Sequence, residues 1–301
     1  MITRRALLAA TAPAILTVKA ASKRAPIATS TLGCPKWTWK QILKVAADNG
    51  YAALELRGIL NEMDLTKVPE LSGTQLAGTM KDLDALGLKV SDLGASARMH
   101  EPDPKKLAQH MDEAKRFIDL AHKMKVPYVR VFPDQLVKGE EKKVTIDRIA
   151  NGLKQLGDYA KPAGVTVVLE SHGEFRNKDL ITPLMQVSKN VAFLWDTHHT
   201  IVDGEKPETT WASLGKYTKH VHLKDSVPDP AKPDDAHLRR YVLTGTGKIP
   251  VRHVVELLAK NGYKGYYCFE WEKRWHPEIE DPEVSFPHFA KTMREYLGQN
   301  V

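Results

Sequence analysis

The sequence predicts a single (β/α)8 barrel, and three observations indicate this fold. Short apolar segments alternate with amphipathic helical patterns along almost the whole chain. The alternation repeats eight times at intervals of roughly 30 residues, which is typical of parallel strands that close into a barrel. No stretch rich in Gly, Pro or Ser divides the 301 residues into two units. We therefore expect one domain, from residue 26 to residue 298.

The first half of the chain contains four predicted strands, each followed by a helix. The strands are expected at 26–32, 53–56, 89–93 and 128–132. Apolar residues recur at helical spacing between and after them. These patterns predict helices at 37–49, 75–86, 107–121 and 146–159. Gly50 and Gly87 follow two of the helices, where a glycine readily adopts the left-handed conformation that ends a helix.

The second half of the chain repeats the pattern. Its strands are expected at 165–170, 191–195, 220–223 and 266–269. Its helices are expected near 179–188, 208–218, 251–260 and 286–297. A long polar stretch, residues 225–240, is rich in Pro and Asp and follows the seventh strand. We predict that this stretch is a functional loop over the site.

Residues 1–20 are predicted to be an export signal. Arg4 and Arg5 precede an apolar stretch, Ala6 to Val18, that is too short to cross a bilayer as a mature helix. Paired arginines are typical of twin-arginine signals, which export folded proteins; an ordinary secretory signal is the alternative. We expect a periplasmic or otherwise exported protein without a membrane anchor after the signal is removed.

Charge and cysteine content restrict the classes of partner. The net charge is +7, and removing the three basic residues Arg4, Arg5 and Lys19 leaves +4. No Lys/Arg-rich run with interleaved aromatic residues is present, so nucleic acid is not the expected partner. Cys34 and Cys268 are too few for a disulfide framework and are expected to be free thiols. The sequence does not determine the oligomeric state.

Four of the predicted strands end in acidic or imidazole side chains. These ends lie in the segments VTVVLESHG (165–173), AFLWDTHH (192–199), HVHLKD (220–225) and YYCFEWE (266–272). The carboxyl ends of barrel strands meet at one mouth, so Glu170, Asp196, His222 and Glu270 should converge there. A solvated rim charge would explain any one of them, but four consecutive strands favour one site. Glu272, on the same side as Glu270, is the alternative fourth ligand.

This set of side chains predicts a metal site. Three carboxylates and one imidazole suit Mn²⁺ or Mg²⁺, with Zn²⁺ or Co²⁺ as alternatives. Further polar residues lie near the predicted strand ends or in the long loop, where they could contact a substrate. They are His172, His199, Lys224, Arg57, His100 and His237. The competing explanation is a packed or metal-supporting histidine for His172 and His199, a salt bridge to a carboxylate for Lys224, and a buried ion pair for Arg57.

These motifs resemble those of the xylose isomerase-like barrel family, which includes ketose 3-epimerases, hydroxypyruvate isomerases, inosose dehydratases and endonuclease IV-type enzymes. The resemblance covers roughly residues 26–298. Its carriers are Glu170 in VVLESH, Asp196 and His199 in WDTHH, His222 in HVHLKD, Glu270 after the turn 262–265, and the glycines of GTG at 245–247. The resemblance implies that Glu170, Asp196, His222 and Glu270 hold one divalent ion. It also implies that Glu170 and Glu270 flank the substrate as an acid/base pair.

The implied reaction is proton transfer next to the carbonyl of a small carbohydrate. An ion that binds the carbonyl lowers the barrier to loss of the neighbouring C–H proton, which one carboxylate removes and the other returns. A sugar isomerase or epimerase is therefore the leading prediction. Pro228 stands where the family's epimerases carry an arginine, six residues after the histidine ligand.

Three alternatives stay open at this point. A lyase or dehydratase acting on a keto-sugar or keto-glycoside would begin with the same proton abstraction. An endonuclease IV-like metal hydrolase would use Asp235 and His237 to hold additional zinc ions. A non-catalytic sugar-binding barrel would require no ion.

Overall fold

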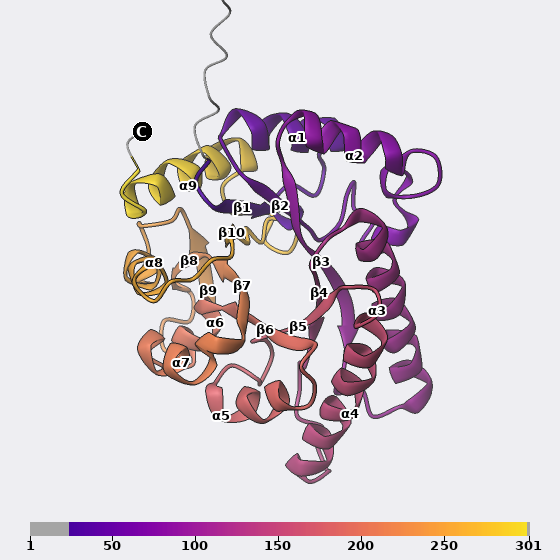
Figure 1. Ribbon diagram of the computed structural model, residues 1–301. Coiled ribbons are helices and arrows are strands. Elements are labelled where there is room, and N and C mark those ends of the chain that lie inside the picture. Colours follow the sequence, from indigo (N-terminus) through magenta and orange to yellow (C-terminus); the bar gives the residue numbers. More distant parts are fainter. Residues whose placement is uncertain (1–23, 300–301) are drawn as a thin grey trace, which may run out of the picture.

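Eight parallel strands close into a barrel in the computed structural model, which describes residues 24–299 (Figure 1). The strands follow one another around the barrel in the order β1-β10-β7-β6-β5-β4-β3-β2. Their bounds are β1 (Ile27–Ser30), β2 (Ala53–Leu56), β3 (Lys89–Arg98), β4 (Tyr128–Phe132), β5 (Thr166–Glu170), β6 (Val191–Asp196), β7 (Thr218–Leu223) and β10 (Tyr267–Phe269). The predicted single (β/α)8 barrel is confirmed.

Helices surround the barrel and connect its strands (Figure 1). Their bounds are α1 (Trp39–Asp48), α2 (Leu76–Ala85), α3 (Pro104–Met124), α4 (Lys142–Ala160), α5 (Lys178–Ile181), α6 (Thr197–Val202), α7 (Pro207–Leu214), α8 (Val251–Lys260) and α9 (Pro282–Tyr296). The helix expected near 179–188 is instead the short α5 followed by a 3-10 helix, Thr182–Gln186. Pro183 lies at the start of that 3-10 segment and has no backbone N–H to continue the α-helical bonding.

The polar stretch after β7 is more ordered than a loop. Its ends form an antiparallel hairpin of β8 (Asp225–Pro228) and β9 (Arg239–Val242). The buried carboxylate of Asp225 accepts hydrogen bonds from the backbone N–H groups of Gly245, Gly247 and Ile249. The hairpin is thereby attached to the segment before α8. Because β8 and β9 are polar, the hydrophobic pattern of the sequence did not indicate these two strands.

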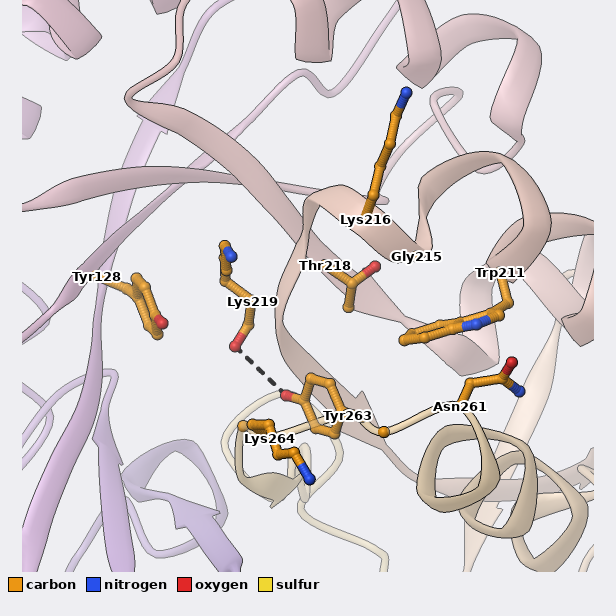
Figure 2. A pocket seen from close by; sticks show the side chains of 11 residues that line it. Tyr128, Trp211, Gly215, Lys216, Thr218, Lys219, Asn261, Tyr263 and Lys264 are labelled. Atoms are coloured by element: carbon orange, nitrogen blue, oxygen red, sulfur yellow. Dashed lines mark hydrogen bonds between the residues drawn. The ribbon is translucent and has the colours of Figure 1, made fainter.

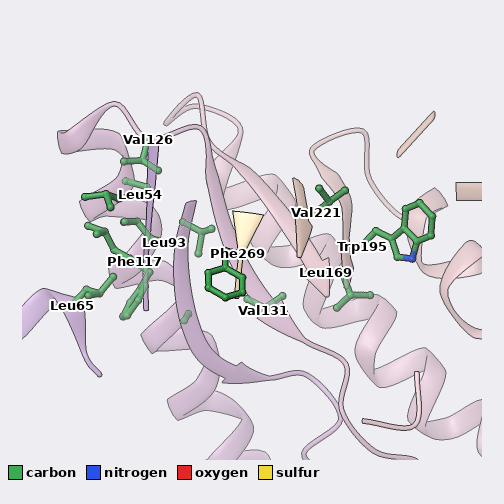
Figure 3. Packing of buried hydrophobic residues seen from close by; sticks show 14 of the residues in the cluster. Leu54, Leu65, Leu93, Phe117, Val126, Val131, Leu169, Trp195, Val221 and Phe269 are labelled. Atoms are coloured by element: carbon green, nitrogen blue, oxygen red, sulfur yellow. The ribbon is translucent and has the colours of Figure 1, made fainter. Parts of the chain in front are cut away.

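The strands present different side chains to the two sides of the barrel wall. Leu54, Leu93, Val131 and Leu169 belong to the large apolar cluster, together with Phe117 of α3 (Figure 3). The inward-facing positions include charged and imidazole side chains, described below.

Cys34 and Cys268 are both buried and unbridged, so the prediction of free thiols is confirmed.

The predicted signal, residues 1–20, lies outside the described residues. Among residues 24–299, no helix combines the length and the apolar composition that a membrane span requires.

The ends of β4 and β5 approach each other closely at Gly173. This glycine has φ +63°, and a Cβ added to it would lie 1.9 Å from the backbone oxygen of Asp134. The same oxygen accepts a hydrogen bond from the N–H of Glu174. A side chain at position 173 is therefore excluded for both steric and conformational reasons.

We expect Gly173→Ala to destabilise the protein more than Gly164→Ala. Gly164 has φ +69° but no atom within 4 Å of an added Cβ, so its substitution isolates the conformational cost of about 1–2 kcal/mol. The collision at Gly173 should add roughly 1–3 kcal/mol. Denaturant unfolding of both variants measures the difference. Equal losses of stability would contradict the close approach.

Candidate functional site

Four ligand-type side chains meet at the C-terminal mouth of the barrel. Glu170 ends β5, Asp196 ends β6, His222 lies near the end of β7 and Glu270 directly follows β10. Each offers one ligand atom, and the four atoms lie within 4.8 Å of one another. All four residues are buried. The group contains Glu270 rather than Glu272, the alternative that the strand pattern left open.

The geometry of this ligand cluster fits a divalent ion. His222 Nδ1 lies 3.3 Å from Glu270 Oε2, 3.6 Å from Glu170 Oε1 and 3.9 Å from Asp196 Oδ2. Neither His222 Nδ1 nor Asp196 Oδ2 has a hydrogen-bond partner among the described residues, although both atoms are buried. Buried polar atoms without partners are costly, and a cation between them would satisfy both. Oxygen donors with one imidazole are a set that such ions accept.

The buried carboxylates repel one another, and this repulsion contributes to the shifted pKa of Asp196. Burial, together with the charges of Glu270 and Glu170, raises the pKa of Asp196 to about 7, although Lys224 opposes the shift. Burial would also raise the pKa of Glu270, but the charges of His222 and Lys224 hold it well below its usual range. A cation in the cluster would offset this repulsion directly.

Two buried cations already pair with the carboxylates. Arg130 of β4 donates from Nη1 to Glu170 Oε2 at 2.9 Å. Burial would raise the pKa of Glu170, but the charge of Arg130 together with the hydrogen bond and charge of His222 outweighs it, and the pKa is lowered. Lys224 Nζ contacts Glu270, lies 2.6 Å from Glu272 Oε1 and lies 2.7 Å from Asp196 Oδ2. The last contact is an ion pair without hydrogen-bond geometry.

A cavity of about 120 Å³ opens beside the ligand cluster. It is lined by Leu32, Arg57, Arg130, Phe132, Glu170, His172, His199, Lys224, Tyr241, Glu270, Glu272 and Trp275. Four of the six predicted substrate contacts are in this lining, namely Arg57, His172, His199 and Lys224. His100 and His237 are not. His237 is exposed on the β8–β9 connection, with Nδ1 2.6 Å from Arg176 Nη1.

Two histidines in the cavity are held by their Nδ1 atoms. His172 Nδ1 lies 2.7 Å from Asp134 Oδ1, and Asp134 also pairs with Arg98 at 3.0 Å. His199 Nδ1 lies 3.0 Å from the backbone oxygen of Ser171. Both acceptors require a proton on Nδ1, which leaves Nε2 of each neutral ring as an acceptor. Burial, with the charge of Lys224, lowers the pKa of His199 well below its usual value.

Arg57 differs from the other buried cations. It donates to Gly94 O and Ser96 Oγ and pairs with no carboxylate among the described residues. Burial and the neighbouring Arg130 lower its pKa to about 9, which leaves it charged at neutral pH. Gly94 makes room for both guanidinium groups, because an added Cβ would lie 2.7 Å from Arg130 Nη2 and from Arg57 Cδ.

Sequence reasoning missed three residues of this region. Arg130 interrupts the apolar strand YVRVF, and a lone charge in a buried strand was the signal that could have found it. Tyr241 donates to Glu272 Oε1 at 2.9 Å but lies in β9, directly after the stretch 225–240 that was expected to be a loop. Asp134 follows β4 and had no signal in the sequence, because its partner His172 is 38 residues away.

A larger cavity, of about 490 Å³, lies at the opposite end of the barrel (Figure 2). It includes Tyr128 and Thr218, the first residues of β4 and β7. Three lysines line it, but no carboxylate or imidazole does. In barrels of this class the reacting groups lie at the carboxyl ends of the strands. The smaller cavity is therefore the candidate active site.

The fold and the ligand cluster together define a parallel barrel with a candidate metal site at its C-terminal mouth. A family model described as xylose isomerase-like TIM barrel matches residues 43–295. The chain belongs to this family, as its motifs predicted.

The curated relatives and the solved structures of similar fold carry different names. The inosose dehydratase of Clostridium botulinum (strain Alaska E43 / Type E3) is 29% identical over 167 residues, which are 51% of this chain and 54% of that protein. The chain thus spans about half the length of the curated relatives it matches. Among solved structures, the zinc-bound IOLI protein has a TM-score of 0.74 at 19% identity, covering 90% of this chain and 98% of that one. A D-psicose 3-epimerase from Clostridium cellulolyticum H10 has a TM-score of 0.70 at 17% identity, covering 91% and 99%.

We expect the purified protein to bind one divalent ion per chain and Asp196→Asn to weaken this binding at least tenfold. Asparagine can still accept the hydrogen bond from His199 N at the start of α6, so the fold should survive while the ligand charge is lost. Metal analysis and titration with Zn²⁺ and Mn²⁺ measure the effect. Asp235→Asn, on the exposed connection, is the matched control and should bind normally.

Two results would contradict this assignment. Unchanged affinity in Asp196→Asn would remove Asp196 from the ligands. About three zinc ions per chain, with loss of zinc in Asp235→Asn, would support the hydrolase alternative instead.

Proposed function

We propose that this chain is a divalent-metal-dependent lyase that removes water from a small keto-sugar or a related cyclic keto-polyol. The observation that carries the proposal is that an imidazole held by Asp134, His172, and a buried ammonium, Lys224, line one cavity beside the candidate ligand cluster. His172 and Lys224 line the same cavity and are chemically unlike, as the base and the acid of an elimination should be. The curated relatives with a dehydratase name support the same class.

The ion pairs of the two glutamates favour a ligand role for both. Glu170 is paired with Arg130 and Glu270 with Lys224, and both carboxyl groups have lowered pKa values. A carboxylate held in its charged form is a good ligand but a poor proton carrier at neutral pH. The acid/base role predicted for Glu170 and Glu270 stays a prediction, and an epimerase would depend on it.

His172 is the proposed base. Asp134 holds its Nδ1–H, orients the ring and stabilises the imidazolium that forms when Nε2 takes a proton. Burial would raise the pKa of Asp134, but the hydrogen bond and charge of His172, with Arg98, lower it, so this carboxylate stays charged. His199, whose pKa is depressed, is suited to accept a hydrogen bond from a substrate hydroxyl.

Arg57 and the ion would stabilise the charge that develops on the substrate. When bound, the ion acts as a Lewis acid that polarises the substrate carbonyl. Arg57, which has no carboxylate partner among the described residues, can donate to the oxygen that becomes negative.

In the proposed elimination, a C–H bond and a C–O bond on adjacent substrate carbons break and a C=C bond forms between those carbons. His172 Nε2 takes the proton from the carbon next to the carbonyl, and the C–H electrons form a C=C bond to the next carbon. The C–O bond on that carbon breaks, and Lys224 Nζ protonates the departing oxygen, which leaves as water. Lys224 is then neutral and His172 charged, and proton exchange with solvent restores both.

Lys224 is protonated before the reaction. Burial would lower its pKa, but Asp196, Glu270 and Glu272 hold it well above the ordinary lysine value. An ion in the cluster would offset part of this negative charge and would make the ammonium a better acid.

For the cellular location we propose export through the signal predicted at residues 1–20. Cleavage at or near Ala20 in a secreting host would test this proposal.

We expect incubation with keto-inositols and keto-sugars in D₂O to yield a product that has lost water. An isomerase or epimerase would instead yield a product of unchanged composition that carries deuterium next to the carbonyl. Mass spectrometry separates the two, and the second result would contradict the lyase proposal.

We expect His172→Asn to lower kcat by roughly 10²–10⁴-fold, because asparagine cannot take the proton. Zinc affinity should change little, since His172 lies outside the ligand cluster. The matched control is His253→Asn, an exposed histidine of α8 that pairs with Glu208. Full activity in His172→Asn would exclude His172 as the base.

A further inference from the structure

A second group of buried polar side chains lies directly beneath the ligand cluster, inside the barrel. It consists of Glu55 of β2, His220 of β7, Cys268 of β10 and the shared His222. His220 and Cys268 precede His222 and Glu270 by two residues, so they lie one layer closer to the N-terminal end of the barrel. All members are at most 1% exposed.

Glu55 is the centre of this group. Its Oε2 lies 2.7 Å from His222 Nε2 and 3.0 Å from His220 Nε2. A carboxylate oxygen accepts hydrogen bonds, so each imidazole must carry a proton on Nε2. Cys268 Sγ lies 3.9 Å from the same oxygen. Glu55 reaches these partners from β2, which is separated from β7 by β1 and β10.

The hydrogen bond between His222 Nε2 and Glu55 determines which nitrogen of the ring faces the ligand cluster. With Nε2 protonated and facing Glu55, Nδ1 faces the carboxylates of Glu170, Asp196 and Glu270. Nδ1 has no hydrogen-bond partner among residues 24–299. The ring therefore presents a defined nitrogen to the point where an ion would lie.

We propose that Glu55 is a positioning residue that selects Nδ1 of His222 as the metal ligand and strengthens it. This inference rests on the ligand cluster of the proposed function, but not on the reaction. A carboxylate behind a ligating imidazole sets its tautomer, prevents ring rotation and increases its donor strength. Glu55 also accepts from His220, which holds the carboxylate itself in place.

The same four residues do not have the spacing of a second metal site. Ligands of a tetrahedral zinc ion at about 2.0–2.1 Å stand roughly 3.3 Å apart. The two contacts of Glu55 Oε2, at 2.7 and 3.0 Å, are shorter than this and have the length of hydrogen bonds. The group supports the first site rather than forming another.

The chain offers a matched control for Glu55. Asp92 of β3 pairs in register with Glu55 and is equally buried. Its carboxylate oxygens have no hydrogen-bond partner in the described part of the chain, so it makes no bond to His222. Asn and Gln replace the two carboxylates with amides of the same shape.

The first test measures zinc affinity by competition with a chelator. Glu55→Gln should weaken zinc binding by roughly 10–100-fold, whereas Asp92→Asn should stay within about threefold of the wild type. Wild-type affinity in Glu55→Gln, or an equal loss in both variants, would overturn the proposal. Two zinc ions per wild-type chain, with one lost in Cys268→Ser, would also overturn it and assign a second metal site.

The second test requires no variant. NMR of the zinc-loaded wild-type protein with ¹⁵N-labelled histidine should show His222 protonated on Nε2, with a slowly exchanging proton, and metal-bound through Nδ1. Coordination through Nε2 would overturn the proposal even if Glu55→Gln fails to fold. A wild-type protein that binds no zinc would overturn the metal site and this inference together. Failure of the lyase reaction alone would change neither measurement.

Discussion

Three carboxylates are buried within a few ångströms of one another at the mouth of the barrel, and the surrounding structure depends on how their charge is offset. Glu170, Asp196 and Glu270 cannot all remain charged in a region of low dielectric constant without nearby cations. Arg130 on one side and Lys224 on the other supply two of them. His222 Nδ1, which faces these carboxylates and has no hydrogen-bond partner among the described residues, marks where a divalent ion would supply the remaining positive charge.

The two walls of the cavity have different electrostatic characters as a result. On the wall formed by β2, β3 and β4, Arg57 and Arg130 lie side by side over Gly94, and within residues 24–299 only Arg130 of the two pairs with a carboxylate. On the opposite wall, Lys224 is surrounded by carboxylates. An excess of positive charge on one side and a proton donor on the other suit a reaction in which negative charge forms at one end of the substrate and a hydroxyl leaves from the other.

Buried residues around the candidate site hold its side chains in position. Glu55 connects β2 to β7 across the interior, and Asp134 connects β4 to the histidine that follows β5. Interior polar residues of this kind are expensive unless they are hydrogen-bonded, and Glu55 and Asp134 each have a hydrogen bond to a histidine of the candidate site. The polar interior of the barrel thus serves the orientation of the groups at its mouth.

The sequence by itself determined the barrel and the strand ends from which the four proposed ligands come. Buried strands are recognisable as apolar runs, and a carboxylate or imidazole at the end of such a run has no packing explanation, so Glu170, Asp196 and His222 could be predicted from local pattern. The same pattern left Glu270 and Glu272 as alternatives for the fourth ligand. The tertiary structure alone decided which partners these residues have. Glu55 and His222 are 167 residues apart, and Arg130 and Glu170 are 40 apart. The hairpin of β8 and β9, which brings Tyr241 to Glu272, was also invisible because its strands are polar. Hydrophobic periodicity records whether a residue is buried, but the closure of the barrel determines which buried residues meet.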